Sequence, residues 1–166
     1  EEILDYVENI GPGNYAAKAA MDIALHDLAG KLLNKPWFRI LGLDPLNTPE
    51  TSFTIGIDKP DIVKKKVFEA SPYSILKVKL GVGDDRKIIT TIREINEKPV
   101  CVDVNQGWKD KIYALEMIHW LHEQNVIFIE QPMPKEMISE LAWLTQESPI
   151  PVIADEGLQT FNDLPT

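Results

Sequence analysis

The sequence predicts an α/β fold in which a parallel sheet is built from repeated strand–helix units. Short apolar runs rich in β-branched residues recur from residue 52 onward. Stretches with helical periodicity separate these runs. Near-continuous apolar strands between helices are typical of a parallel sheet, which is either doubly wound or closed into a (β/α)8 barrel.

The composition narrows the classes of function. The chain has 166 residues and a formal net charge of -9. Because an acidic chain does not attract a phosphate backbone, we expect no nucleic-acid partner. No apolar run approaches the ~20 residues of a membrane span, so we expect no membrane partner either. The single cysteine, Cys101, excludes an intrachain disulfide and favours a cytoplasmic location.

The first part of the chain is expected to be helical. A Gly-Pro-Gly breaker precedes Asn14, which is a good N-cap, and small apolar residues then recur at helical spacing. We expect one long helix over residues 15–34 with a closely packed face of small residues, ended by Pro36. The other expected elements are a helix at 2–9, a helical turn at 37–41 and a linker at 43–50.

Five strands and four helices are expected to alternate in the second part. Asp84 and Asp85 follow the second strand and can cap the next helix, while Cys101 and Trp108 are expected to pack against apolar neighbours. The strands are expected at 52–57, 74–80, 100–104, 126–129 and 151–154, and the helices at about 60–70, 84–96, 111–123 and 135–147.

A charged residue stands at the end of four of these strands. Lys79, Asp103, Glu130 and Asp155 are separated by 24, 27 and 25 residues, which is about one strand–helix unit each time. Each unit therefore delivers a charge to the carboxyl end of its strand, where barrel enzymes build their active sites. The competing interpretation is that these acids only cap the helices that follow.

The residue types point to metal-assisted proton transfer. Three carboxylates held together without partners would repel and raise one another's pKa values, and a divalent cation such as Mg²⁺ or Mn²⁺ would relieve this. Lys77 and Lys79 are two residues apart, so both side chains face the same side of the strand. Two ammonium groups this close are expected to lower the pKa of one, which suits a general base.

These motifs resemble a known family. The order and spacing of K-V-K at 77–79, D-V-N-Q-G-W from Asp103, I-E-Q-P around Glu130 and A-D-E-G around Asp155 are similar to the muconate-lactonising-enzyme subgroup of the enolase superfamily. The helix at 14–31 resembles the last helix of that family's N-terminal capping domain. The run T-S-F-T-I-G-I at 51–57 resembles the first barrel strand of its dipeptide epimerases.

The resemblance implies a fold and a domain division. The fold would be part of a (β/α)8 barrel, with about five strand–helix units, preceded by the end of an α+β capping domain. Residues 1–45 would be the C-terminal part of the capping domain. Residues 46–166 would be the first part of the barrel domain, truncated after strand five.

The resemblance also implies an activity, the Mg²⁺-dependent epimerisation of dipeptides such as L-Ala-D/L-Glu. Asp103, Glu130 and Asp155 would bind Mg²⁺ (or Mn²⁺), which would hold the substrate carboxylate and stabilise the enediolate formed when the α-proton leaves. Lys79 would be the general base. The other implied site residues are Lys77 beside the substrate carboxylate, Thr54 in contact with the substrate, and Asn105 and Glu156 next to the metal ligands.

Further parts of such an enzyme are expected outside this sequence. A second lysine on strand six and an acidic motif on strand eight would lie beyond Thr166. Because a complete barrel takes ~250 residues, we expect a segment of a longer protein, which the resemblance implies to be a homo-oligomer. Two alternatives stay open. One is a cycloisomerase or an o-succinylbenzoate-synthase-like dehydratase of the same subgroup, and the other is an inactive fragment with a structural or binding role.

Overall fold

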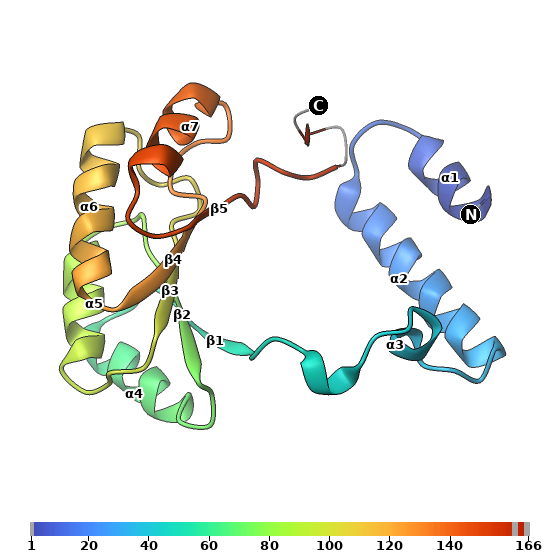
Figure 1. Ribbon diagram of the computed structural model, residues 1–166, viewed down its shortest axis with the longest axis horizontal. Helices are drawn as coiled ribbons and strands as arrows, with labels where there is room; N and C mark the ends of the chain where they lie inside the picture. Colours follow the sequence, from blue (N-terminus) through green and yellow to red (C-terminus); the bar gives the residue numbers. More distant parts are fainter. Residues whose placement is uncertain (1, 161–162, 165–166) are drawn as a thin grey trace. The chain divides into compact units, whose positions relative to one another are not determined.

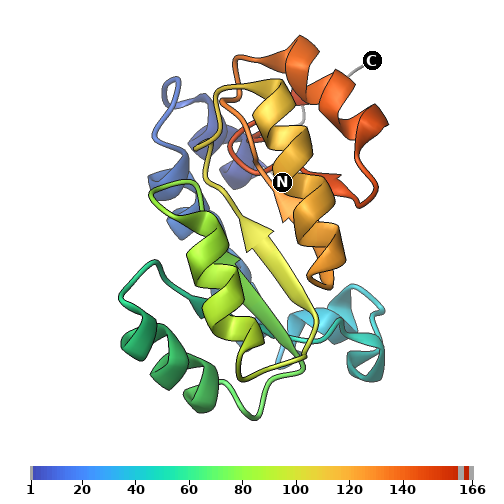
Figure 2. The same ribbon diagram turned by 90° about the vertical axis from the view of Figure 1, so that its left-hand side faces the viewer.

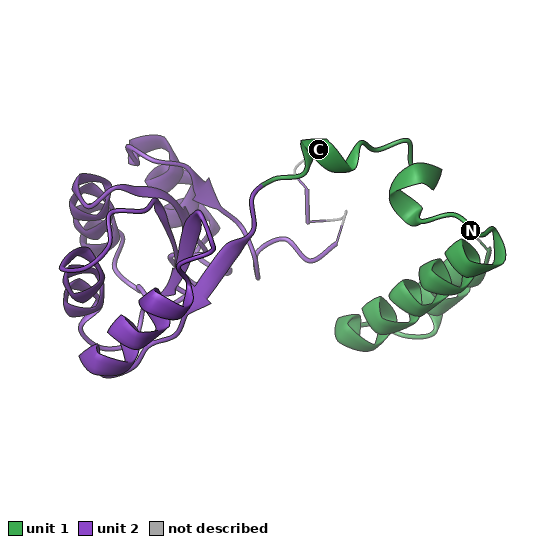
Figure 3. Cartoon of the chain, turned by 90° about the horizontal axis from the view of Figure 1, so that it is seen from below, with its two compact units in different colours: residues 1–49 green, residues 50–166 purple. Residues whose placement is uncertain are grey.

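The computed structural model describes residues 2–160 and 163–164, and the chain divides into two compact units, residues 1–49 and 50–166 (Figures 1 and 3). The regular elements described in unit 1 are all helical, whereas those in unit 2 alternate between strands and helices. No helix in the described part of the chain combines the length and apolar character that crossing a membrane requires.

Unit 1 contains the helices that the sequence predicts. The expected linker includes one short 3-10 turn. The elements are α1 (Glu2–Asn9), α2 (Tyr15–Leu32), α3 (Trp37–Ile40) and η1 (Pro45–Asn47). Gly30 is buried near the end of α2. A Cβ there would lie 3.1 Å from the main-chain oxygen of Lys35 and 3.4 Å from the indole ring of Trp37 on α3, which is tight for any larger residue.

Asn14 occupies the N-cap position of α2, as predicted, but its side chain makes no capping hydrogen bond, because its backbone adopts a left-handed conformation with φ of 55°. Another prediction about α2 is wrong. The face of small residues is not closely packed, since Ala16, Ala20 and Ala24 are exposed. Among the described residues of unit 1, α1 and α3 lie against α2, and these two short helices leave much of its surface uncovered.

All five strands and four helices predicted for unit 2 are present, some of them a few residues shorter than expected. The strands are β1 (Ser52–Ile55), β2 (Ile75–Lys79), β3 (Val100–Asp103), β4 (Val126–Glu130) and β5 (Val152–Ile153). The helices are α4 (Pro60–Glu69), α5 (Asp85–Arg93), α6 (Lys111–Glu123) and α7 (Ile138–Glu147).

The sheet order distinguishes between the two predicted architectures. The five strands pair in the order β1-β2-β3-β4-β5, every pair is parallel, and α4 to α7 lie on one face (Figures 1 and 2). A doubly wound sheet reverses its strand order at a switch point and carries helices on both faces. The described sheet does neither, so its architecture is that of part of a (β/α)8 barrel.

One row of apolar side chains attaches the sheet to the helices. Ile55, Val78, Val102 and Ile129 lie in register on consecutive strands and are fully buried. Burial of each such side chain contributes about 1.5–3 kcal/mol. Cys101 is also buried, as predicted, and burial raises the pKa of its thiol.

Two basic side chains bind main-chain carbonyl groups at the amino ends of the strands. The Arg93 guanidinium donates to the main-chain oxygens of Gln124 at 2.7 Å and Lys98 at 2.8 Å. The Lys98 ammonium donates to the main-chain oxygens of Ser71 at 2.7 Å and Tyr73 at 2.6 Å. Main-chain carbonyls at this edge are thus bound by the protein itself, which leaves the opposite edge to carry chemistry.

Candidate active site

Three of the predicted site residues lie side by side at the carboxyl edge of the sheet. The strand register pairs Lys79 on β2 with Asp103 on β3, and Asp103 with Glu130 on β4. The fourth charged residue, Asp155, lies two residues after Ile153, which is the β5 residue that pairs with Glu130. The structure therefore brings together the four charges that the sequence places one unit apart.

A bulge in β4 makes this alignment compatible with the core. Val126 pairs with Val100, but the next β3 residue, Cys101, pairs with Phe128, so Ile127 is left without a partner in the ladder. Because of this extra residue, β4 pairs correctly at both ends: Val126 is buried opposite Val100, and Glu130 lies beside Asp103. Bulges of this kind commonly re-aim side chains next to functional sites.

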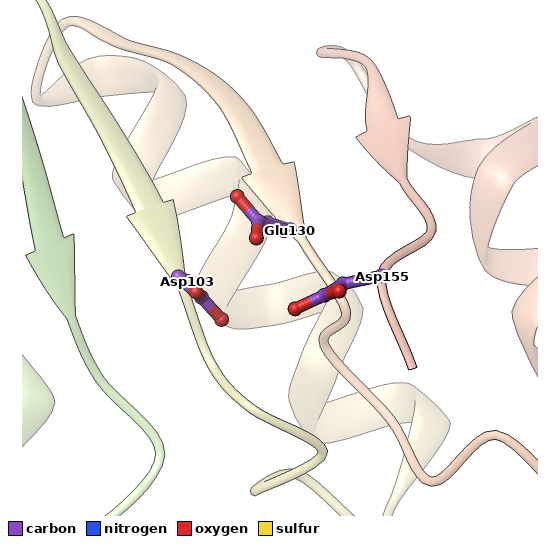
Figure 4. Close-up of side chains that lie close together, drawn as sticks. All are labelled: Asp103, Glu130 and Asp155. Atoms are coloured by element: carbon purple, nitrogen blue, oxygen red, sulfur yellow. The ribbon is translucent and has the colours of Figure 1, made fainter. Parts of the chain in front are cut away.

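The three carboxylates converge (Figure 4). One oxygen atom from each of Asp103, Glu130 and Asp155 lies within 4.8 Å of the other two; Asp103 is buried, Glu130 half-buried and Asp155 exposed. Mg²⁺ binds oxygen at about 2.1 Å, so ligands on opposite sides of one ion are about 4.2 Å apart. This all-oxygen cluster therefore fits a hard divalent cation after little movement.

Asn105 links these elements to the loop after β5. Its main-chain N–H donates to Oδ1 of Asp103 at 3.1 Å, and its side-chain amide donates to Oε1 of Glu156 at 3.3 Å. The second carboxylate oxygen of Glu156, Oε2, is buried without a hydrogen-bond partner among the described residues. A buried, unpartnered carboxylate oxygen is unfavourable, and a nearby cation would reduce that cost.

Both lysines contact the carboxylates. Nζ of Lys77 lies 2.7 and 2.6 Å from the two carboxylate oxygens of Glu130 and 3.0 Å from Oδ2 of Asp103. Nζ of Lys79 lies 2.6 Å from the same Asp103 oxygen and 2.8 Å from Oδ1 of Asn105. Two positive and three negative groups are thus concentrated at one edge of the sheet.

Hydrogen bonds between opposite charges set two pKa shifts in this cluster. Burial lowers the pKa of Lys77, but hydrogen bonds to Glu130 and Asp103 outweigh burial and leave that pKa raised, so the lowered pKa expected for one of the two lysines is not found at Lys77. Burial likewise raises the pKa of Asp103, but hydrogen bonds from Lys79, Lys77 and the Asn105 N–H outweigh it and leave that pKa lowered. Opposite charges at hydrogen-bond distance dominate over like charges.

Thr54, expected to touch the substrate, lies on the strand next to Lys77. It pairs with Lys77 in the register of β1 and β2, and it is exposed. It therefore occupies the same sheet as the charged cluster, at the level of the first lysine of the K-V-K motif.

The loops after β2 and β3 are in close contact. Gly81 has φ of +94°, and a Cβ there would lie 2.3 Å from the main-chain oxygen of Val104. Asp85 fastens this contact: its buried carboxylate accepts from the Gly81 N–H and from Nε1 of Trp108, both at 2.9 Å. Trp108 packs in the core as predicted, whereas Asp84 caps α5 and Asp85 has this different task.

Besides Asp85, Gln131 is a residue whose role was not predicted from the sequence. It directly follows Glu130, it is buried, and its backbone is left-handed with φ of 37°. The available signal was an amide residue between Glu130, at a strand end, and Pro132.

Family profiles match both parts of the chain. The profile described as "Mandelate racemase / muconate lactonizing enzyme, N-terminal domain" matches residues 1–42, and the one described as "Enolase C-terminal domain-like" matches residues 62–165. The chain is 57% identical over 165 residues to the L-Ala-D/L-Glu epimerase of Bacteroides thetaiotaomicron. The matched region makes up 99% of this chain and 43% of that protein.

Solved structures share the fold. The dipeptide epimerase of Cytophaga hutchinsonii, complexed with Mg and the dipeptide D-Ala-L-Val, is 31% identical with a TM-score of 0.75, over 89% of this chain and 41% of that chain. The muconate lactonizing enzyme of Pseudomonas fluorescens, complexed with muconolactone, is 28% identical with a TM-score of 0.82, over 96% of this chain and 45% of that chain.

A partial α/β barrel with acidic residues at consecutive strand ends defines the class of protein, and the profiles define the family. The chain belongs to the mandelate racemase / muconate lactonizing enzyme family of the enolase superfamily, which confirms the predicted resemblance. It spans less than half the length of the relatives named above.

Proposed function

We propose that the protein carrying this chain is a Mg²⁺-dependent epimerase of dipeptides of the L-Ala-D/L-Glu kind. The observation that carries the proposal is the contact between a lysine, Lys79, and the carboxylate cluster at the sheet edge. The epimerase from Bacteroides thetaiotaomicron, at 57% identity, supports this choice over other reactions of the family.

Asp103, Glu130 and Asp155 would hold the cation, for which they supply only oxygen ligands. When bound, the cation would withdraw electron density from the substrate carboxylate and make the α-proton more acidic. Asn105 would orient Asp103 through its N–H, and Glu156 would lie beside this set, where its unpartnered oxygen supports a role near positive charge.

Lys79 would take the α-proton. Its neutral amine accepts the proton from the α-carbon at Nζ, and the electron pair of the broken C–H bond stays on the substrate. The ammonium group of Lys77 would face the substrate carboxylate and stabilise the negative charge that develops there. Thr54, next to Lys77 in the sheet, would contact the remainder of the dipeptide.

We further propose the domain division at residues 1–45 and 46–166, with the first segment in a capping domain and the second in the barrel. The profile matches at 1–42 and 62–165 and the compact units at 1–49 and 50–166 support it. The cytoplasmic location, the homo-oligomer and the use of Mn²⁺ stay predictions.

The test is α-proton exchange in D₂O, followed by nuclear magnetic resonance, with L-Ala-L-Glu or L-Ala-D-Glu as substrate and the full-length protein as catalyst. We expect deuterium at the glutamate α-carbon together with the other epimer. Lys79→Ala should lower both rates by about 100-fold or more, the scale of general base catalysis. Lys87→Ala, an exposed lysine on α5, is the matched control and should leave both rates unchanged.

Three results would contradict the proposal in different ways. Unchanged exchange in Lys79→Ala would exclude Lys79 as the base. Neither exchange nor epimerisation of a dipeptide, by a protein that does bind Mg²⁺, would favour a cycloisomerase or dehydratase. Absence of saturable Mg²⁺ binding by the intact protein would favour a structural or binding role.

A further inference from the structure

Gln131 connects the segment that carries Asp155 to the rest of the site. Its side chain is 1% exposed and makes three hydrogen bonds. Oε1 accepts from the main-chain N–H of Asp155 at 2.9 Å and of Gly157 at 3.0 Å, and Nε2 donates to the main-chain oxygen of Met133 at 3.0 Å. We propose that Gln131 is a positioning residue, which holds Asp155 at the distance from Asp103 and Glu130 that cation binding requires.

The shortness of β5 explains why such a residue is needed. β5 has only two residues, and its last ladder bond runs from the N–H of Gln131 to the main-chain oxygen of Ile153 at 2.8 Å. Beyond Ile153 the two main chains no longer pair, and the side chain of Gln131 accepts the next N–H on that edge, that of Asp155. The side chain thus continues the ladder by one step, up to the residue that carries the third carboxylate.

The main chain of Gln131 binds the remaining neighbour. Its carbonyl oxygen accepts from the N–H of Gln106, in the loop after β3, at 2.9 Å. Gln131 also directly follows Glu130. One residue therefore directly follows β4 and contacts the segments after β3 and β5, next to all three carboxylate residues.

The chemistry of the position selects an amide. A side chain here must accept two N–H groups with one atom and donate to a carbonyl with another, which an uncharged amide does and a carboxylate does not. Asparagine is one methylene too short to span the same three partners. An apolar side chain of equal size would remove the hydrogen-bond partner of two N–H groups and one C=O.

Asp155 depends on this support more than the other two ligands do. Asp103 is buried and Glu130 half-buried, each at the end of a paired strand, whereas Asp155 is exposed and lies outside any strand. Without Gln131, the segment after Ile153 would sample more conformations, and ordering it again would reduce the free energy of cation binding.

This inference rests on the cation site of the proposed function, and the test separates the two. In the full-length protein, Mg²⁺ binding is measured by titration calorimetry, and Mn²⁺ binding by electron paramagnetic resonance serves as a second readout. For Gln131→Met, which keeps the size and removes the amide, we expect a dissociation constant raised about 10-fold or more, in the range found for residues that support metal ligands. Gln146→Met, at an exposed glutamine on α7, is the matched control and should bind as the wild type does.

Kinetics distinguish positioning from loss of structure. Raising Mg²⁺ to saturation should restore most of the kcat of Gln131→Met, whereas it should not restore that of Lys79→Ala. Gln131→Asn, which keeps a polar amide, provides a second variant with a smaller perturbation. In the wild type without Mg²⁺, the Asp155 and Gly157 amides should already be protected from hydrogen exchange.

The outcomes are separable. Wild-type Mg²⁺ affinity in a folded Gln131→Met, or unprotected Asp155 and Gly157 amides in the wild type, would overturn the role of Gln131 and leave the proposed function standing. Weakened Mg²⁺ binding in Gln131→Met by a protein that epimerises no dipeptide would support the role of Gln131 and overturn the proposed function.

Discussion

The ammonium nitrogen of Lys77 lies within 2.7 Å of both carboxylate oxygens of Glu130. One oxygen of this carboxylate belongs to the cluster that would bind a divalent cation. Lysine and cation therefore compete for one carboxylate, and the charge of Lys77 opposes the charge of the ion.

Removal of this lysine should strengthen metal binding. For Lys77→Met in the full-length protein, we expect Mg²⁺ to bind on the order of tenfold more tightly, as loss of repulsion between like charges a few ångströms apart predicts. Calorimetric titration measures the effect. Lys87→Met changes the net charge equally from an exposed position on α5 and should bind Mg²⁺ as the wild type does. Weaker binding in Lys77→Met would show that the lysine supports the site.

Mg²⁺ should stabilise the fold. A ligand that binds only the folded state at 100 times its dissociation constant adds about 2.7 kcal/mol to the free energy of unfolding. We expect the melting temperature of the full-length protein to rise with Mg²⁺ and to return when a chelator is added. Asp103→Asn should abolish the rise, whereas Glu147→Gln, at an exposed acid on α7, should not. A rise of equal size in Asp103→Asn would place the binding ion elsewhere.

The two glycines after β2 should respond differently to alanine. Both have a strongly positive φ, +94° at Gly81 and +99° at Gly83, so both substitutions incur a similar backbone cost of about 1–3 kcal/mol. Only at Gly81 would the new Cβ also meet the Val104 oxygen, at 2.3 Å; at Gly83 nothing lies within 4 Å. Urea denaturation should therefore show a larger loss for Gly81→Ala. Equal losses of unfolding free energy would mean that the loop after β2 can move away from the loop after β3.

The hydrogen bond between Trp108 and Asp85 should contribute to stability. Trp108→Phe removes the Nε1 donor and leaves a buried carboxylate oxygen without that partner, at an expected cost of about 1–3 kcal/mol. Because the smaller ring also loses packing, a double-mutant cycle with Asp85→Ala isolates the bond. We expect a coupling free energy of about 0.5–3 kcal/mol by denaturant unfolding. Additive effects would indicate that the contact contributes nothing.

The sequence predicted the alternation of strands and helices because hydrophobic period and breaker residues are local signals. It also placed Asp103, Glu130 and Asp155 at strand ends, since each follows an apolar run directly. A parallel sheet does the rest, because it aligns the ends of consecutive strands at one edge.

Other features depend on partners that are distant in the sequence. The pKa of Lys77 rises because Glu130, 53 residues away, lies against it, and spacing within β2 carries no information about that contact. The three bonds of Gln131 likewise require β5 to be in place beside β4. At Asn14 a local signal was ambiguous. Asparagine suits a capping side chain, but it also tolerates the left-handed backbone that it adopts here.

The bulge in β4 affects how the site tolerates deletions. Because Ile127 has no partner in the ladder, β4 could lose this residue and still keep Glu130 level with Asp103. β2 and β3 pair without any such surplus, so loss of one residue there would turn Lys79 or Asp103 to the helix-covered face. A single-residue deletion would thus be absorbed in one strand, whereas in its neighbours it would force a charge into the apolar core.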